Sequence, residues 1–144
     1  ADKSNMARYI FTGFKRCLYE AEKFDSDPER RLAVILDRDA DKWFKPRLGQ
    51  FQIWYSDGVD SREYQPDFVA EDAGSHYLLE SKASNRLDDP IVLAKRNAAV
   101  TWCRHATDFT VSFGGKPWRY VLIPHDQIAE NRTLSGLALV HGLK

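Results

Sequence analysis

The chain has 144 residues, of which 43% are hydrophobic and 12% aromatic, which is enough material for one domain with its own core and too little for two. It carries 21 Lys and Arg residues against 21 Asp and Glu residues, so it lacks the overall basic field that promotes indiscriminate binding to polyanions. Any nucleic-acid contact must come from a local basic patch. No run approaches the ~20 apolar residues of a membrane span, and no secretory signal opens the sequence. We therefore expect a single cytoplasmic domain over residues 1–144.

The cysteines and histidines of the chain are scattered singly. Cys17 and Cys103 lack CxxC spacing, which favours buried reduced thiols over a disulfide or a zinc pair. The histidines likewise lack the close spacing that zinc ligands normally show. The pattern argues against a zinc site and is typical of a cytosolic protein.

The N-terminal quarter of the chain is predicted to be helical. Apolar residues recur at spacings of three and four between Met6 and Lys23, as in an amphipathic helix. A second helix should begin after Ser26, because Glu29 completes a capping box and Pro28 is tolerated in the first turn. Glu29 then has two interpretations that both stay open, a reciprocal cap with Ser26 or an additional metal ligand beside the sheet.

Three strands are expected to follow and to form a meander. Pro46 ends any preceding helix, and residues 50–56 have the composition of a first strand. Residues 62–70 and 75–82 have the composition of the second and third strands. The turn-forming residues 71–74 should join these two strands into a hairpin.

The C-terminal half is predicted to add helix, strand and helix. Asp88-Asp89-Pro90 is a helix-start signal for a helix from about Ile91 to Ala106. Residues 118–124 are a nearly continuous apolar run, typical of a central strand covered on both faces. Thr133 is expected to cap a short terminal helix. The predicted fold is an α/β sandwich with a central mixed sheet, the meander plus a further strand, flanked by helices.

The open end of the predicted hairpin carries the candidate site. Asp67 should lie opposite Glu80, and Glu80 and Lys82 share a face because residues two apart on a strand point the same way. Ser81 is then expected to point away and to offer only its backbone carbonyl. Two carboxylates suit Mg²⁺, for which Mn²⁺ can substitute, and an ammonium group can orient the attacking water. The pattern predicts metal-assisted phosphodiester hydrolysis.

Three basic residues near this end are candidate DNA contacts. Lys95 and Arg96 fall in the first half of the helix after the hairpin, and Arg86 lies in the loop before it. A helix that leaves directly from the Glu80 strand would carry its early residues past the site, where they could anchor phosphates. The alternative, an ordinary solvated surface residue, stays open for each of them.

The order of these elements resembles the core of the PD-(D/E)xK nuclease superfamily. More narrowly, the chain resembles the C-terminal endonuclease domain of the restriction subunits of type III restriction enzymes and related helicase-nuclease proteins. The motifs are individually weak, but they occur in order and on the expected elements. The segments that carry the closer resemblance are residues 24–30, 42–44, 64–69, 77–82 and the helix from Lys95 to Cys103.

The resemblance implies roles for individual residues. It implies that Asp67 and Glu80 are metal ligands and that Lys82 is the catalytic lysine. Glu29 matches an acidic residue that the superfamily often carries on its first core helix, and Lys95 matches a polar residue on the helix after the motif. Mg²⁺ is the implied cofactor, and the implied product is a DNA strand break with a 5′-phosphate.

The resemblance also implies partners. Double-stranded DNA is the expected substrate, and a helicase or ATPase, on the same chain or on another subunit, is the expected motor. Gly114-Gly115-Lys116 lacks the spacing of a phosphate-binding loop, so the motor should lie outside residues 1–144. A modification methyltransferase subunit and a dimer on DNA are further expectations.

Other functions remain open from the sequence. The domain could be a nuclease fold that binds DNA or assembles without turnover, because fold alone does not establish activity. It could also be a nuclease of DNA repair, or a small metallohydrolase acting on another substrate. The intact Asp67, Glu80 and Lys82 set favours a nuclease over an inactive module, and the lack of a histidine-rich ligand set argues against the metallohydrolase.

Overall fold

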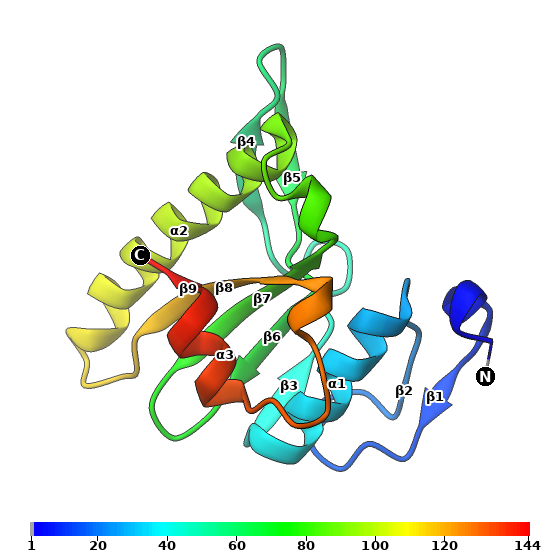
Figure 1. Ribbon diagram of the computed structural model, residues 1–144. Coiled ribbons are helices and arrows are strands. Elements are labelled where there is room, and N and C mark those ends of the chain that lie inside the picture. The colour runs from blue at the N-terminus through cyan, green and yellow to red at the C-terminus, as the bar shows by residue number, and fades with distance from the viewer. Residues whose placement is uncertain (1) are drawn as a thin grey trace.

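A five-stranded mixed sheet lies at the centre of the computed structural model, which describes residues 2–144 (Figure 1). Strands β7 and β8 are parallel, and every other neighbouring pair is antiparallel. Strands β3, β7 and β8 therefore run in the same direction and end at the same edge of the sheet. In spatial order the strands are β3 (Lys42–Phe44), β6 (Phe68–Glu71), β7 (His76–Lys82), β8 (Trp118–Pro124) and β9 (Gly142–Leu143).

Helices cover both faces of this sheet. Helices α1 (Asp27–Asp39) and α3 (Leu134–His141) pack on one face, and α2 (Pro90–Val111) packs on the other. Because successive side chains of a strand point to opposite faces of the sheet, the core is divided into two clusters, one on each face. The α1 and α3 face buries Phe68, Ala70, Tyr77, Leu79, Val121 and Ile123, and the α2 face buries Val69, Leu78, Tyr120 and Leu122. The predicted α/β class, with a mixed central sheet flanked by helices, is confirmed.

Several local predictions are also confirmed. Ser26 caps α1 by accepting the Glu29 N–H at 3.3 Å. Helix α2 begins at Pro90, as expected, and continues to Val111. The β6–β7 hairpin forms around residues 72–75, and β8 ends at Pro124. Thr133 caps α3 by accepting the Gly136 N–H at 3.0 Å.

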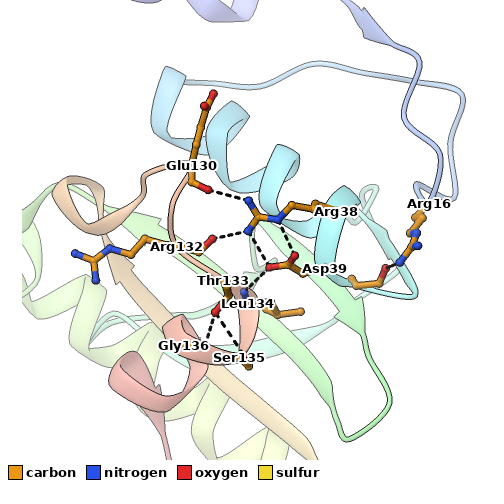
Figure 2. A network of polar contacts seen from close by, with 10 residues as sticks. Arg16, Arg38, Asp39, Glu130, Arg132, Thr133, Leu134, Ser135 and Gly136 are labelled. Atoms are coloured by element: carbon orange, nitrogen blue, oxygen red, sulfur yellow. Dashed lines mark hydrogen bonds and ion pairs between the residues drawn. The ribbon is translucent and has the colours of Figure 1, made fainter.

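The end of α1 is tied to the segment that leads into α3 (Figure 2). The Arg38 guanidinium donates to the backbone oxygens of Glu130, at 2.8 Å, and of Arg132. The Asp39 carboxylate accepts from Arg38 and also from the Leu134 N–H at 2.9 Å. These bonds position α3 beside α1 although the two helices lie far apart in the sequence.

The predicted helix over residues 6–23 is wrong. This segment forms a short 3-10 helix (Lys3–Arg8) and the two-residue strands β1 (Phe11–Thr12) and β2 (Ala21–Glu22). Gly13 adopts φ +86°, which interrupts any helix. Phe14 packs edge-on against Trp43, so the apolar residues of the segment reach the core from extended chain. Hydrogen bonds between the Arg16–Leu18 backbone and Trp43 cover the outer edge of β3.

The predicted three-strand meander is also wrong in its strands. Residues 62–70 do not form one strand, because Pro66 cannot donate a ladder hydrogen bond and the chain breaks at residues 65–67. Strands β4 (Ile53–Ser56) and β5 (Ser61–Tyr64) form a separate two-stranded hairpin. Figure 1 shows this hairpin projecting beside the first turns of α2. The strand that pairs with β6 is β3, whose residues were not predicted as a strand.

The prediction of buried reduced thiols is confirmed for Cys103, whereas Cys17 is only partly buried. Cys17 and Cys103 are both free. Burial raises the pKa of the Cys103 thiol to about 12, so it stays protonated and acts as a core residue. Over residues 2–144, no helix combines the length and the apolar character needed to cross a membrane.

Candidate active site

The candidate residues meet where β7 and β8 end and β6 begins. Asp67 directly precedes β6, and Glu80 and Lys82 lie at the C-terminal end of β7. Glu29 lies in the first turn of α1, near enough to Asp67 that the Asp67 charge adds to the larger effect of burial in raising the pKa of Glu29. The structure therefore brings four of the predicted residues to one place.

Asp67 and Glu80 hold each other through the backbone. The Asp67 N–H donates to Glu80 Oε1 at 3.2 Å, and Tyr64 donates its hydroxyl to the same oxygen at 2.7 Å. Asp67 Oδ2 accepts the Ser81 N–H at 2.9 Å. One oxygen of each carboxylate is thus fixed by the protein.

The second oxygen of each carboxylate is left for another ligand. Within residues 2–144, neither Asp67 Oδ1 nor Glu80 Oε2 takes part in a hydrogen bond. Glu22 Oε2 is fully buried and has no hydrogen-bond partner among the described residues, whereas neither of these two atoms is both fully buried and unpartnered. Lys82 Nζ lies 3.7 Å from Glu80 Oε2, on the face that the sequence predicted. Two solvent-accessible carboxylate oxygens beside an ammonium group can accept a hard cation.

The orientation of Ser81 differs from the prediction. Its hydroxyl contacts Asp67 Oδ2 at 3.2 Å, so its side chain belongs to the site and does not simply point away. Asp67 lies before β6, so its side chain need not follow the alternation of side chains between the two faces of the sheet. Its carboxylate therefore reaches the face of β7 that carries the Ser81 side chain. Ser81 therefore helps to orient a carboxylate.

Burial of the carboxyl groups dominates the electrostatics of the site. Burial, with a smaller contribution from the Asp67 charge, raises the pKa of Glu80 to about 8. Burial also raises the pKa of Asp67, and burial together with the Asp67 charge raises that of Glu29. A bound cation would favour the ionised forms of all three groups. The donor set fits a hard divalent cation such as Mg²⁺, which accepts one or two carboxylates and keeps several waters.

Glu29 is already engaged on both oxygens. Oε2 accepts the Asp25 N–H at 2.7 Å, and Oε1 forms an ion pair with Lys45. The reciprocal cap therefore forms with Asp25 and not with the Ser26 N–H. In the part of the chain that the structure describes, no group of three or more His, Cys, Asp or Glu side chains is arranged to hold a metal ion. The metal-ligand interpretation of Glu29 stays a prediction.

Four residues of the site were missed by sequence reasoning. Lys45 pairs with Glu29 and lies over the rings of Phe24 and Phe68. The hydroxyl groups of Tyr64 and Tyr120 are 3.0 Å apart beneath Glu80. The fourth, His125, follows the residue that pairs with Lys82 across β7 and β8.

The environment of His125 follows from its place in the sheet. Burial lowers its pKa, and the nearby Asp67 charge opposes that shift. Only the parallel register of β7 and β8 could have pointed to His125, because nothing in its local sequence does.

The three predicted DNA contacts lie in different surroundings. Lys95 Nζ lies 5.6 Å from the ring centroids of both Tyr55 and Tyr64, so it is one aromatic ring from Glu80. Arg96 lines a separate hollow of about 450 Å³ with Arg104 and Lys144. Arg86 is exposed and paired with Asp89 at 2.7 Å. Of the three, Lys95 alone is linked to the carboxylates by contacts of the described residues.

A separate hollow lies at the other end of the hairpin. It has a volume of about 540 Å³ and is lined by residues that include Glu71, His76 and Trp118. Glu71 and His76 pair next to the turn, whereas Asp67 and Glu80 lie at the open end. This hollow is separate from the carboxylate site.

No protein-family model, curated protein or solved structure matches the chain. The fold and site by themselves define a mixed α/β domain that holds a carboxylate and lysine cluster at one edge of its central sheet.

Proposed function

We propose that the chain is a Mg²⁺-dependent endodeoxyribonuclease domain that cuts double-stranded DNA in a type III-like restriction system. The observation that carries the proposal is that Asp67 Oδ1 and Glu80 Oε2 make no hydrogen bond within residues 2–144, while Glu80 Oε2 lies 3.7 Å from Lys82 Nζ. A purely structural pair of buried carboxylates would be expected to have all of its oxygens satisfied. Here one oxygen of each makes no hydrogen bond among the described residues.

We further propose that the fold is a restriction-endonuclease-like sandwich. Asp67 precedes the second strand of the central sheet, and Glu80 and Lys82 lie on the third. This is the placement that the resemblance to PD-(D/E)xK nucleases implies. Helices on both faces of a mixed sheet agree with it.

The chemistry of this site follows from its donors. Asp67 Oδ1, Glu80 Oε2 and the Ser81 carbonyl would hold Mg²⁺, with Mn²⁺ as a substitute, and the bound ion would polarise the phosphate and lower the pKa of a water. Lys82 would position that water and offset negative charge on the phosphate oxygens. Tyr64 and Ser81 keep Glu80 and Asp67 in fixed orientations. Lys45 keeps Glu29 from adding an unpaired charge.

The proposed partners are those expected from the sequence. They are a helicase or ATPase that delivers the DNA, a modification methyltransferase subunit, and a second copy of the domain for double-strand cleavage. The cytoplasm is the proposed location.

A nicking assay on supercoiled plasmid tests the function. The wild-type domain should nick the plasmid in the presence of Mg²⁺ or Mn²⁺, and EDTA should abolish the nicking. Asp67→Asn, Glu80→Gln and Lys82→Met should each lower the rate by about 10²-fold or more, since each removes a group that acts on the reacting centre. Glu130→Gln is the matched control, because the Glu130 side chain is exposed and only its backbone oxygen makes a described contact.

Two outcomes would overturn this proposal. Full activity of both Asp67→Asn and Lys82→Met would rule out the site. DNA binding without any metal-dependent cleavage would favour the alternative of an inactive binding module. Equal thermal unfolding of the variants and the wild type in EDTA would exclude misfolding as the cause of lost activity.

A further inference from the structure

Another hollow lies beside the carboxylate site, and three of its seven lining residues are cationic. Its volume is about 380 Å³, and its lining includes Lys23, Lys45 and Arg47 against one carboxylate, Glu22. The hollow lies between β2 and the residues that follow β3. Neither the sequence nor the proposed chemistry assigns it a role.

Arg47 is held in place by contacts with Glu22 and Tyr19. Its guanidinium pairs with Glu22 at 2.9 Å and lies 4.1 Å from the ring centroid of Tyr19. The Glu22 side chain is 1% exposed, whereas that of Arg47 is 51% exposed. A fixed guanidinium that keeps donors free toward solvent is well suited to a phosphate group.

The ion pair between Glu22 and Arg47 is not explained by a contribution to stability. Glu22 Oε2 is buried and lacks a hydrogen-bond partner within residues 2–144. Burial raises the pKa of Glu22, although Arg47 and Lys45 oppose the shift. A buried carboxylate with one oxygen unsatisfied costs free energy, and what it provides here is the orientation of Arg47.

Lys45 connects this hollow to the carboxylate site. It lines the hollow, and its Nζ donates to the Lys23 backbone oxygen at 3.1 Å and pairs with Glu29. The charge of Lys45 also lowers the pKa of Asp67, against the larger effect of burial. If a DNA strand passed over Lys45, the phosphate on one side would lie near Lys23 and Arg47, and the phosphate on the other side would lie near the carboxylates.

We propose that Lys23 and Arg47, continued by Lys45, bind the phosphodiester backbone of DNA next to the cleaved position. The DNA then crosses the molecule on the side of β2 and the end of β3, and not over the face of α2 that carries Arg96 and Arg104. The assignment rests on the proposed nuclease function for its substrate. It does not depend on cleavage, because binding can be measured without metal.

The test is fluorescence anisotropy of a labelled 20-bp duplex with the whole chain in EDTA, over a series of KCl concentrations. Lys23→Ala removes an exposed side chain that forms no described ion pair, and Glu22→Gln/Arg47→Met removes the second charge together with its buried partner. Each should weaken binding several-fold and lower the slope of log K against log salt by about 1. Arg104→Ala, which removes an exposed cation from α2, should leave both unchanged.

The outcomes separate this inference from the proposed function. Cleavage with unchanged DNA binding by both variants overturns the inference and leaves the nuclease standing. DNA binding that depends on Lys23 and Arg47, without cleavage, supports the inference and removes the nuclease. An equal loss in Arg104→Ala overturns the inference by showing a diffuse charge effect. Displacement of the duplex by equimolar inorganic phosphate would also overturn it, since the hollow would then be a site for small anions.

Discussion

Asp67 donates its backbone N–H to the Glu80 side chain at 3.2 Å, which joins the start of β6 to the end of β7. The bond aligns two carboxylates that would otherwise repel each other. It also makes the position of Glu80 depend on the chain break at Pro66, because a continuous β5–β6 strand would direct this N–H elsewhere. The consequences for pH, stability and cation binding can be measured.

The contribution of Glu80 to the stability of the metal-free protein should fall as pH rises. The pKa of Glu80 is raised from 4.5 to about 8 in the folded protein, so the folded state binds more protons than the unfolded state between these values. Stability is then highest below about pH 4.5 with respect to this group, and it decreases through pH 8 by at most about 1.4 kcal/mol per pH unit. The raised pKa values of Asp67 and Glu29 act in the same direction.

Urea denaturation at pH 5 and pH 8 in EDTA measures this effect. Glu80→Gln should flatten the dependence, and Mg²⁺ should restore stability at pH 8 by binding the ionised carboxylates. A Glu80→Gln variant with the same difference in stability between pH 5 and pH 8 as the wild type would contradict the electrostatics described for this site, because the lowered pKa values of His76, His125 and His141 act in the opposite direction in both proteins.

Tyr64→Phe should weaken both folding and cation binding. The Tyr64 hydroxyl donates to the buried Glu80 carboxylate, so its removal leaves an acceptor unsatisfied, at a cost of about 1–3 kcal/mol. Loss of this donor also makes ionisation of Glu80 harder and should raise the Mn²⁺ dissociation constant, measured by titration calorimetry. Tyr120→Phe is the matched control, because it leaves the Tyr64 to Glu80 bond intact. Equal Mn²⁺ affinities in the two variants would argue against the role of Tyr64.

Glu29 and Lys45 should show strong coupling in a double-mutant cycle. Both side chains are largely buried, at 4% and 17% exposed, so removing either one leaves a buried charge and should cost about 3–5 kcal/mol. The double variant Glu29→Gln/Lys45→Met should recover part of this loss. Urea denaturation measures the three variants, and additive effects would show that the pair does not interact. Normal Mn²⁺ affinity in the double variant would favour the capping role of Glu29 over the ligand role.

Asp39→Ala should destabilise the protein without affecting the site. Its carboxylate accepts the Leu134 N–H and a bond from Arg38 (Figure 2), so its loss should cost about 1–2 kcal/mol and loosen α3. Hydrogen exchange should increase in α3, while Mn²⁺ affinity stays that of the wild type at temperatures where the variant is folded. A change in Mn²⁺ affinity would mean that α3 and the carboxylates are coupled.

Local sequence patterns located much of the site. The strand composition of residues 75–82 placed Glu80 and Lys82 on one face, and the Ser26 and Pro28 signals began α1 at the correct residue. The turn at residues 71–74 aligned Asp67 with Glu80. These features depend on contacts between residues close in sequence, which is why the sequence alone predicts them.

The sequence by itself thus determined the mixed α/β class, the hairpin register and the Asp67, Glu80 and Lys82 cluster. Only the tertiary structure decided which strand lies beside β6, that residues 6–23 pack as extended chain, and that Lys45, Tyr64, Tyr120 and His125 surround the carboxylates. The physical reason is that those arrangements depend on burial and pairing between distant segments. The two carboxylate oxygens of Asp67 and Glu80 that make no hydrogen bond among the described residues belong to this second group, because they can be identified only when the partners of every neighbouring donor are known.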